Sequence, residues 1–287
     1  VDAVDADELL DAAAQGMIVA TDPYTEYLSE DDMADFEMLT TGRYGGVGSL
    51  IRKKGDYVIF AQPYKGSPSD EAGIKIGDRI LAIDGEDMRG STTEDISARL
   101  KGEPETSVEV VVERNIDNRR DTLTLIRRRI SIPSVGYYGI IRDGVGYISH
   151  LDFIEGSYGE MRRAVEALMA TDSLRGIVLD YRSNGGGVMQ EAVDIASLFV
   201  PRGERVVSIM GRDSSSLTHY DTHYAPLAEN VPIVVLVSGS SASASEIVCG
   251  ALQDMDRAVL MGQRSYGKGL VQNVVPLGYD AYLKLTT

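Results

Sequence analysis

The second half of the chain alternates short apolar runs with segments of helical periodicity, and this alternation constrains the fold more than any other feature. The strand candidates are residues 145–149, 177–179 and 233–237, and the helical segments between and after them are 161–169, 189–199 and 247–255. Strands separated by crossover helices form a mainly parallel sheet covered by helices. The pattern therefore predicts an α/β core over residues 131–287.

The first half has a different texture. Short β-type runs separated by turn dipeptides predict a compact β-rich module over residues 44–130, with strand candidates at 58–61, 80–83, 108–112 and 123–126. Within it, Ser91-Thr92-Thr93-Glu94 resembles a capping box, so a helix is expected to begin there. Residues 1–43 carry two short helical patterns and are expected to form a helical N-terminal segment.

Composition excludes several classes of function. The chain has 28 Lys plus Arg against 44 Asp plus Glu, a net charge of −16, whereas nucleic acids and anionic membranes attract clustered positive charge. No stretch approaches the roughly 18 consecutive apolar residues of a membrane-spanning helix. Cys249 is the only cysteine, which excludes an internal disulfide framework and a multi-cysteine zinc site. No cofactor motif stands out, so no cofactor is expected.

A glycine-rich segment, Tyr44-Gly45-Gly46-Val47-Gly48-Ser49, opens the β-rich module, and a long turn-rich segment from Ser67 to Gly85 follows it. Consecutive glycines let backbone amides converge on an anion, and the strand after them offers an edge to a peptide. A tight turn without a ligand is the alternative explanation. Together the two segments resemble a PDZ domain. That resemblance implies that Gly46, Val47, Gly48 and Ser49 bind the terminal carboxylate of a peptide.

A second segment runs from a buried strand through small residues into a helix, as Val235-Leu236-Val237-Ser238-Gly239-Ser240-Ser241-Ala242-Ser243-Ala244-Ser245-Glu246-Ile247. Small side chains permit a sharp turn, and free amides at the start of a helix can stabilise a developing oxyanion. A serine nucleophile fits this position, although helix capping by serine explains the segment as well. The residues alone leave open which of Ser241, Ser243 and Ser245 would attack.

A third segment contains Gly267-Lys268-Gly269. Backbone can approach a lysine between two glycines closely, and a lysine shielded from water loses its proton more readily. Lowering its pKa from about 10.4 to near neutrality takes about three units, or about 4 kcal/mol, which burial can supply. Lys268 is therefore a candidate general base, and a solvated loop lysine is the alternative.

Taken together, these residues have the pattern of a known family. Ala242-Ser243-Ala244-Ser245-Glu246-Ile247, followed by Tyr266-Gly267-Lys268-Gly269 and Gln272 downstream of the PDZ-like module, resembles the C-terminal processing peptidases, also called tail-specific proteases. The resemblance covers nearly the whole chain. It implies Ser243 as the nucleophile, Lys268 as the general base and Gln272 as the residue that orients the lysine. Glu246 and Asp254 also lie at positions that this family uses around its site.

A fourth segment, Asp180-Tyr181-Arg182-Ser183-Asn184-Gly185-Gly186-Gly187, follows a strand candidate at the sheet edge where ligand sites gather. In the resembled family this loop supplies half of the oxyanion hole, which implies that the amides of Gly186 and Ala244 form the pair. Family members commonly carry a proline where Gly185 stands. A phosphate-binding loop is the competing interpretation, but no glycine-lysine-serine or glycine-lysine-threonine ending follows.

The histidines are His150, His219 and His223. The spacing of the last two would suit a metal on a helix, but their neighbours show no helical face and no glutamate lies between them, so a surface loop is expected. A serine, histidine and aspartate arrangement with Ser243 stays an alternative to the lysine mechanism.

The hypothesis is an α/β serine endopeptidase with a Ser243–Lys268 dyad, whose PDZ-like module captures the C-terminal tails of protein or peptide substrates. The alternatives are a non-catalytic peptide-binding scaffold and an acyl-transfer enzyme acting on small thioesters or esters. The resemblance implies an extracytoplasmic location, periplasmic or membrane-peripheral, and a start at Val1 is compatible with removal of a targeting segment. It also implies that the chain continues past Thr287, and a homo-oligomer is compatible with it.

Overall fold

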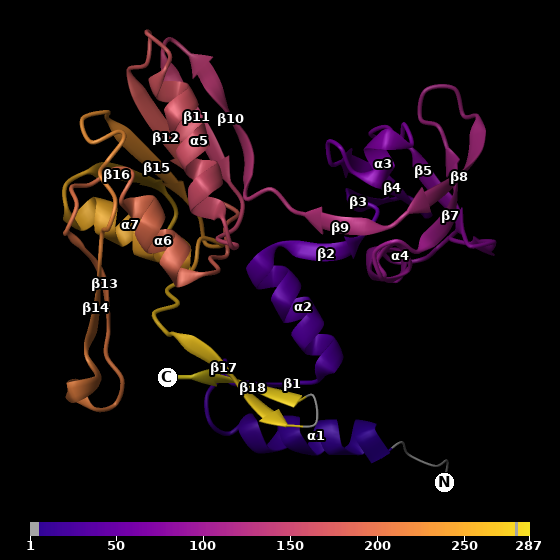
Figure 1. Ribbon diagram of the computed structural model, residues 1–287, viewed down its shortest axis with the longest axis horizontal. Coiled ribbons are helices and arrows are strands. Elements are labelled where there is room, and N and C mark those ends of the chain that lie inside the picture. Colours follow the sequence, from indigo (N-terminus) through magenta and orange to yellow (C-terminus); the bar gives the residue numbers. More distant parts are fainter. Residues whose placement is uncertain (1–5, 279–280) are drawn as a thin grey trace. The chain divides into compact units, whose positions relative to one another are not determined.

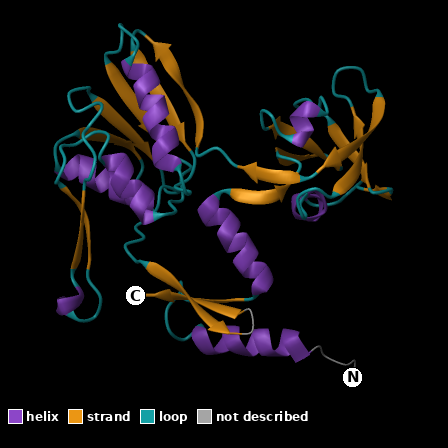
Figure 2. Ribbon diagram, in the orientation of Figure 1, coloured by secondary structure: helices purple, strands orange, loops and turns teal. Residues whose placement is uncertain are grey.

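The computed structural model describes residues 6–278 and 281–287. The chain divides into two compact units, one formed by Val1–Gly42 together with Pro133–Thr287 and the other by Arg43–Ile132 (Figures 1 and 2). Each unit has its own buried apolar cluster. The N-terminal segment therefore belongs to the same compact unit as the C-terminal part of the chain.

The first unit contains most of the helices. They are α1 (Ala6–Ile18), α2 (Glu30–Thr41), α5 (Ser157–Met169), α6 (Met189–Ala196), α7 (Ala244–Asp254) and the short 3-10 helix Ser214–Ser216. Its strands are β1 (Glu26–Leu28), β10 (Val135–Arg142), β11 (Val145–His150), β12 (Gly176–Asp180), β13 (Arg205–Ile209), β14 (Thr218–Asp221), β15 (Ile233–Val237), β16 (Ala258–Gly262), β17 (Gln272–Gly278) and β18 (Ala281–Thr286).

The central sheet has the strand order β10-β11-β12-β15-β16. All its neighbours pair in parallel except β10 and β11, which confirms the predicted mainly parallel sheet. Because consecutive parallel strands are also neighbours in space, right-handed crossovers place α5, α6 and α7 on one face of the sheet (Figure 1). Alternate residues of β15, namely Ile233, Val235 and Val237, are buried in the resulting core.

Two smaller sheets complete this unit. Strands β13 and β14 form a hairpin, and β1, β18 and β17 form a three-stranded antiparallel sheet in that order. The sequence patterns predict neither β1 nor the hairpin. Since β1 lies in the N-terminal segment and β18 at the other end of the chain, this sheet joins residues that are 258 positions apart.

The second unit is the predicted β-rich module. Its strands are β2 (Arg43–Gly46), β3 (Ser49–Lys54), β4 (Tyr57–Pro63), β5 (Arg79–Ile83), β6 (Glu86–Asp87), β7 (Ser107–Glu113), β8 (Arg120–Ile126) and β9 (Arg128–Ser131), with helices α3 (Pro68–Glu71) and α4 (Thr93–Leu100). The capping box of α4 is one residue later than expected: Thr92 is the N-cap and Asp95 the reciprocal partner, instead of Ser91 and Glu94. Both registers place a hydroxyl three residues before a carboxylate, so the local pattern does not separate them.

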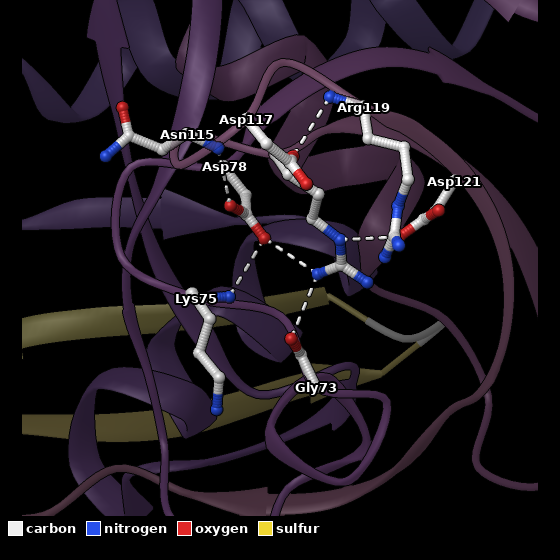
Figure 3. A network of polar contacts seen from close by, with 8 residues as sticks. Gly73, Lys75, Asp78, Asn115, Asp117, Arg119 and Asp121 are labelled. Atoms are coloured by element: carbon white, nitrogen blue, oxygen red, sulfur yellow. Dashed lines mark hydrogen bonds and ion pairs between the residues drawn. The ribbon is translucent and has the colours of Figure 1, made fainter.

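A polar network stabilises the turns of this module (Figure 3). The Arg114 guanidinium donates to Asp78, to Asp121 and to the Gly73 carbonyl at 2.7–2.9 Å. Asp78 is 1% exposed and also accepts the backbone amides of Lys75 and Asn115. A buried carboxylate with this set of partners is satisfied, and it fixes the loop before β5 against the loop after β7.

None of the helices in the described ranges combines the length and apolar character that a bilayer-spanning segment requires.

Candidate active site

The turn between β15 and α7 holds Ser243 in an unusual backbone conformation. Its φ is 54° and its ψ is −115°, although non-glycine residues rarely adopt a positive φ. Such a conformation costs about 1–3 kcal/mol and persists only where surrounding contacts enforce it. A serine on a strained strand-to-helix turn presents its hydroxyl outward at the start of the helix, as nucleophilic serines of several hydrolases do.

The structure separates the three serines that the sequence leaves open. Ser241 and Ser245 are fully buried and donate their hydroxyls to the carbonyls of Tyr181 and Asn184, at 2.7 and 3.0 Å. Ser243 is partly exposed. Of the three hydroxyls, that of Ser243 is therefore the one that a substrate can reach, and the other two fasten the turn to the loop after β12.

Gly186, in the glycine-rich loop after β12, lies against this turn. A Cβ atom at Gly186 would come within 2.7 Å of the Ala242 carbonyl oxygen, 2.8 Å of the Ser243 Cβ and 2.9 Å of the Ala244 nitrogen. Its N–H, however, donates to the Asn184 Oδ1 at 2.9 Å. The two residues expected to form the oxyanion hole, Gly186 and Ala244, are therefore close together in space. In this structure, however, the Gly186 N–H is occupied by a hydrogen bond to the buried Asn184 side chain.

The Glu246 carboxylate connects the serine turn to the lysine loop. It accepts the backbone N–H groups of Ser243, Gly267 and Lys268 at 2.7–2.9 Å and the Ser265 hydroxyl at 2.7 Å. Burial raises the pKa of Glu246, but the hydrogen bonds from Ser265 and the three amides together hold this pKa below its ordinary value. An ionised Glu246 therefore holds both segments at neutral pH.

Lys268 and Gln272 are in contact. The Lys268 ammonium donates to the Gln272 Oε1 at 2.9 Å, and Gln272 in turn donates through Nε2 to the carbonyl of Tyr24. The Lys268 Nζ also lies 5.1 Å from the centroid of the Tyr24 ring. Burial is the main cause that lowers the pKa of Lys268, followed by the nearby charge of Lys284. Within the described residues, no hydrogen bond joins the Lys268 amine to the Ser243 hydroxyl.

The sequence patterns predict no role for two residues at this site, Tyr24 and Asn184, although Asn184 lies within the glycine-rich site segment. Tyr24 comes from the N-terminal segment and reaches the lysine through the three-stranded sheet. Asn184 is fully buried and bonds to Gly186 and to the His150 carbonyl. In contrast, Asp254 ends α7 eleven residues beyond Ser243 and is exposed, so the structure does not bring it to the site.

In the described ranges, none of the three histidines forms a hydrogen bond with Ser243. His150 is 2% exposed within the core, and burial lowers its pKa to about 3. His219 is on β14, where its Nδ1 lies 2.8 Å from the Ser208 Oγ, so the expected surface loop is wrong at this point and a hairpin stands there. His223 follows that hairpin and is exposed.

The glycine-rich loop of the second unit connects β2 to β3. Gly48 has a φ of 74°, and its carbonyl accepts the hydroxyls of Ser67 and Ser69 at 2.8 and 2.7 Å. The N–H groups of Val47 and Gly48 donate to no group in the described part of the chain, although both residues are buried. A shallow pocket beside them is lined by Tyr44, Val47, Ser49, Ile51, Ser97, Leu100 and Lys101, from β2, β3, α4 and adjoining loops.

Comparison with known proteins places this architecture in a family. The model of peptidase family S41 matches residues 144–287, and a PDZ domain model matches residues 59–114. The solved photosystem II D1 C-terminal processing protease is 31% identical with a TM-score of 0.56, over 98% of this chain and 76% of that protein. The chain belongs to peptidase family S41.

Other S41 relatives agree with this assignment. The carboxy-terminal-processing protease of Bartonella bacilliformis is 33% identical over 287 residues, which is 99% of this chain and 65% of that protein. A CtpA-like serine protease of Staphylococcus aureus is 34% identical over 285 residues, 98% of this chain and 56% of that protein. The chain thus spans between half and two thirds of these S41 relatives. An S41 protease from Bacteroides fragilis, 19% identical with a TM-score of 0.58 over 100% of this chain and 79% of that one, shares the fold.

Proposed function

We propose that this S41 chain is a serine endopeptidase that recognises protein substrates by their C-terminal tails, with Ser243 as nucleophile and Lys268 as general base. One observation carries the proposal: Glu246 holds the amide of Ser243 and the amide of Lys268 at once, at 2.8 and 2.9 Å. A single carboxylate thus ties the accessible serine on its strained turn to the lysine that contacts Gln272. A peptide-binding scaffold would have no need of this arrangement.

In the proposed reaction, the neutral Lys268 amine takes the proton of the Ser243 hydroxyl as the oxygen attacks the peptide carbonyl. The resulting oxyanion lies at the start of α7, where the N–H of Ala244 has no partner within the helix. The Gly186 N–H is the second donor once it exchanges Asn184 for the substrate oxygen. The protonated lysine then donates its proton to the leaving amine. In the second step, Lys268 takes a proton from the attacking water and gives it to the Ser243 oxygen, which releases the acyl group.

Tail recognition is assigned to the loop Gly46–Ser49. The N–H groups of Val47 and Gly48, which have no partner in the described residues, support carboxylate binding, and the adjoining β3 edge supports pairing with an extended peptide. An extracytoplasmic location is part of the proposal and rests on family resemblance alone.

Cleavage of a flexible protein with an apolar C-terminus, followed by mass spectrometry, tests the proposal. We expect Ser243→Ala and Lys268→Ala to abolish cleavage, because each removes one member of the proton transfer. Ser240→Ala is the matched control, since Ser240 is exposed on the same turn and its loss should leave cleavage intact. Cleavage that survives Ser243→Ala or Lys268→Ala would refute the dyad. No cleavage by the parent chain, with tail binding retained, would favour a binding module.

A further inference from the structure

The three-stranded sheet that joins the two ends of the chain presents one face to the Lys268 amine. Gln272 on β17 lies opposite Thr286, and Lys284 lies opposite both Val274 on β17 and Glu26 on β1. Cross-strand partners and alternate residues along a strand project from the same face. The side chains of Gln272, Lys284 and Glu26 therefore share one face, and the Gln272 Oε1 on that face accepts the Lys268 amine.

Tyr24, just before β1, fixes the orientation of the Gln272 amide. Because the Gln272 Nε2 donates to the Tyr24 carbonyl, its Oε1 must face the other way, toward the Lys268 Nζ. The Tyr24 ring covers the amine at 5.1 Å, and a hydrogen bond with Tyr266 raises the pKa of the Tyr24 hydroxyl. Asp22 accepts the Tyr24 N–H at 2.8 Å and so holds this segment in place.

Lys284 and Glu26 form an ion pair on the same face. The Lys284 Nζ lies 2.7 Å from the Glu26 Oε2, and the lysine side chain is 21% exposed. The Lys284 Nζ also lies 6.0 Å from the centroid of the Phe36 ring. The charged groups that act on the Lys268 amine are Lys284 from β18 and Glu26 from the N-terminal segment, and the Tyr24 ring lies over it. Tyr266 from the lysine's own loop interacts with Tyr24, and Glu246 from α7 accepts the Lys268 backbone N–H. Of these, the positive Lys284 disfavours a proton on Lys268, and the negative Glu26 favours it.

We propose that this face of the β1–β18–β17 sheet is the support of the general base, with Tyr24, Glu26 and Lys284 as positioning residues. Tyr24 holds Gln272 and the amine in place, and Lys284 and Glu26 bias the amine toward its neutral and its charged form respectively. The inference rests on the proposed role of Lys268 and adds residues that no sequence motif contains. It also gives the N-terminal segment a part in the chemistry.

The test is the pH dependence of kcat/KM for a peptide substrate. The rate rises with pH as Lys268 loses its proton, so the midpoint of this acid limb reports the amine. We expect Lys284→Met to move the midpoint up and Glu26→Gln to move it down, each by about 0.5 pH unit, with both shifts smaller in 1 M salt. Lys284→Arg keeps the charge and should restore the parent midpoint. Tyr24→Ala should lower kcat with KM nearly unchanged, whereas Tyr24→Phe keeps the ring and should retain most of kcat.

The control is a second cross-strand ion pair. Arg205 on β13 lies opposite Asp221 on β14, with its Nε 3.0 Å from the carboxylate, and neither charge is among those that shift the pKa of Lys268. Arg205→Met and Asp221→Asn should leave the midpoint unchanged. The inference would be wrong if Lys284→Met and Glu26→Gln moved the midpoint of the pH profile in the same direction, or did not move it, in variants whose activity still requires Lys268. If Lys268→Ala keeps its activity, the proposed base itself is wrong and the inference falls with it.

Discussion

Replacing Gly186 by alanine perturbs the contact between the glycine-rich loop and the nucleophile turn. At a φ of 103° an L-residue is strained, which costs about 1–3 kcal/mol. The new Cβ would lie 2.7 Å from the Ala242 oxygen, where ordinary contact begins at 3.4 Å, so loop and turn must separate by 3.4 − 2.7 = 0.7 Å. Because a misplacement of about 1 Å near the reacting atoms costs about 100-fold in rate, we expect kcat to fall about 10- to 100-fold.

The assay is single-turnover acylation, measured by the release of a chromophoric leaving group from an activated ester. Gly185→Ala is the matched control, because Gly185 has no atom within 4 Å of its added Cβ and has no positive φ. We expect a slow acylation step for Gly186→Ala and a normal one for Gly185→Ala. If the two variants acylate at equal rates, the spacing between this loop and Ser243 does not limit the reaction.

Three further predictions concern stability and binding. Arg114→Met leaves the buried Asp78 carboxylate without its cation and should lower the free energy of unfolding in urea by about 3 kcal/mol. Arg119→Met removes an exposed partner of Asp121 and should cost less than about 1 kcal/mol; equal losses would contradict a buried network. Because the pKa of Glu246 is lowered in the folded chain, its stabilisation is complete above the unfolded pKa of about 4.3 and vanishes as pH falls through the folded value; Glu246→Gln should therefore be less stable than the parent at pH 7 and match it near pH 2. A fluorescent apolar peptide should bind more weakly as its C-terminal amide than as its acid, and equal affinity would reject the carboxylate loop.

The core strands and the serine turn are predictable because their information is local. Residues 145–149, 177–179 and 233–237 are short apolar runs flanked by helical patterns, and all three lie in the observed strands. The hydroxyl at Ser243 is equally local, since small residues between a buried strand and a helix allow a sharp turn. The pattern could not choose among the three serines. That choice depends on tertiary contacts, because the hydroxyls of Ser241 and Ser245 are buried and donate to the carbonyls of Tyr181 and Asn184.

The direction of single amides is also beyond the sequence. The glycines after β12 predict a loop near the substrate. The direction of the Gly186 N–H, however, is set by Asn184, two residues earlier in the chain, whose side-chain oxygen accepts it. An asparagine in such a loop is compatible with this turn and with several others. The orientation follows from the burial of Asn184 between the His150 carbonyl and the serine turn, which is a tertiary effect.

The surroundings of the base are the least local part of the site. Lys268 and Gln272 are four residues apart and form a motif. Burial is the largest cause of the lowered pKa of the amine, and the charges that act on it beyond burial, Lys284 and Glu26, come from the two ends of the chain. Pairing such distant strands costs loop-closure entropy, which packing and hydrogen bonds must offset before the contact forms. The base is therefore complete only when β1 has paired with β18, whereas the serine turn is held by the central sheet, the loop after β12 and Glu246. A chain in which this pairing is broken should keep an accessible Ser243 and lose the environment that prepares the amine to take its proton.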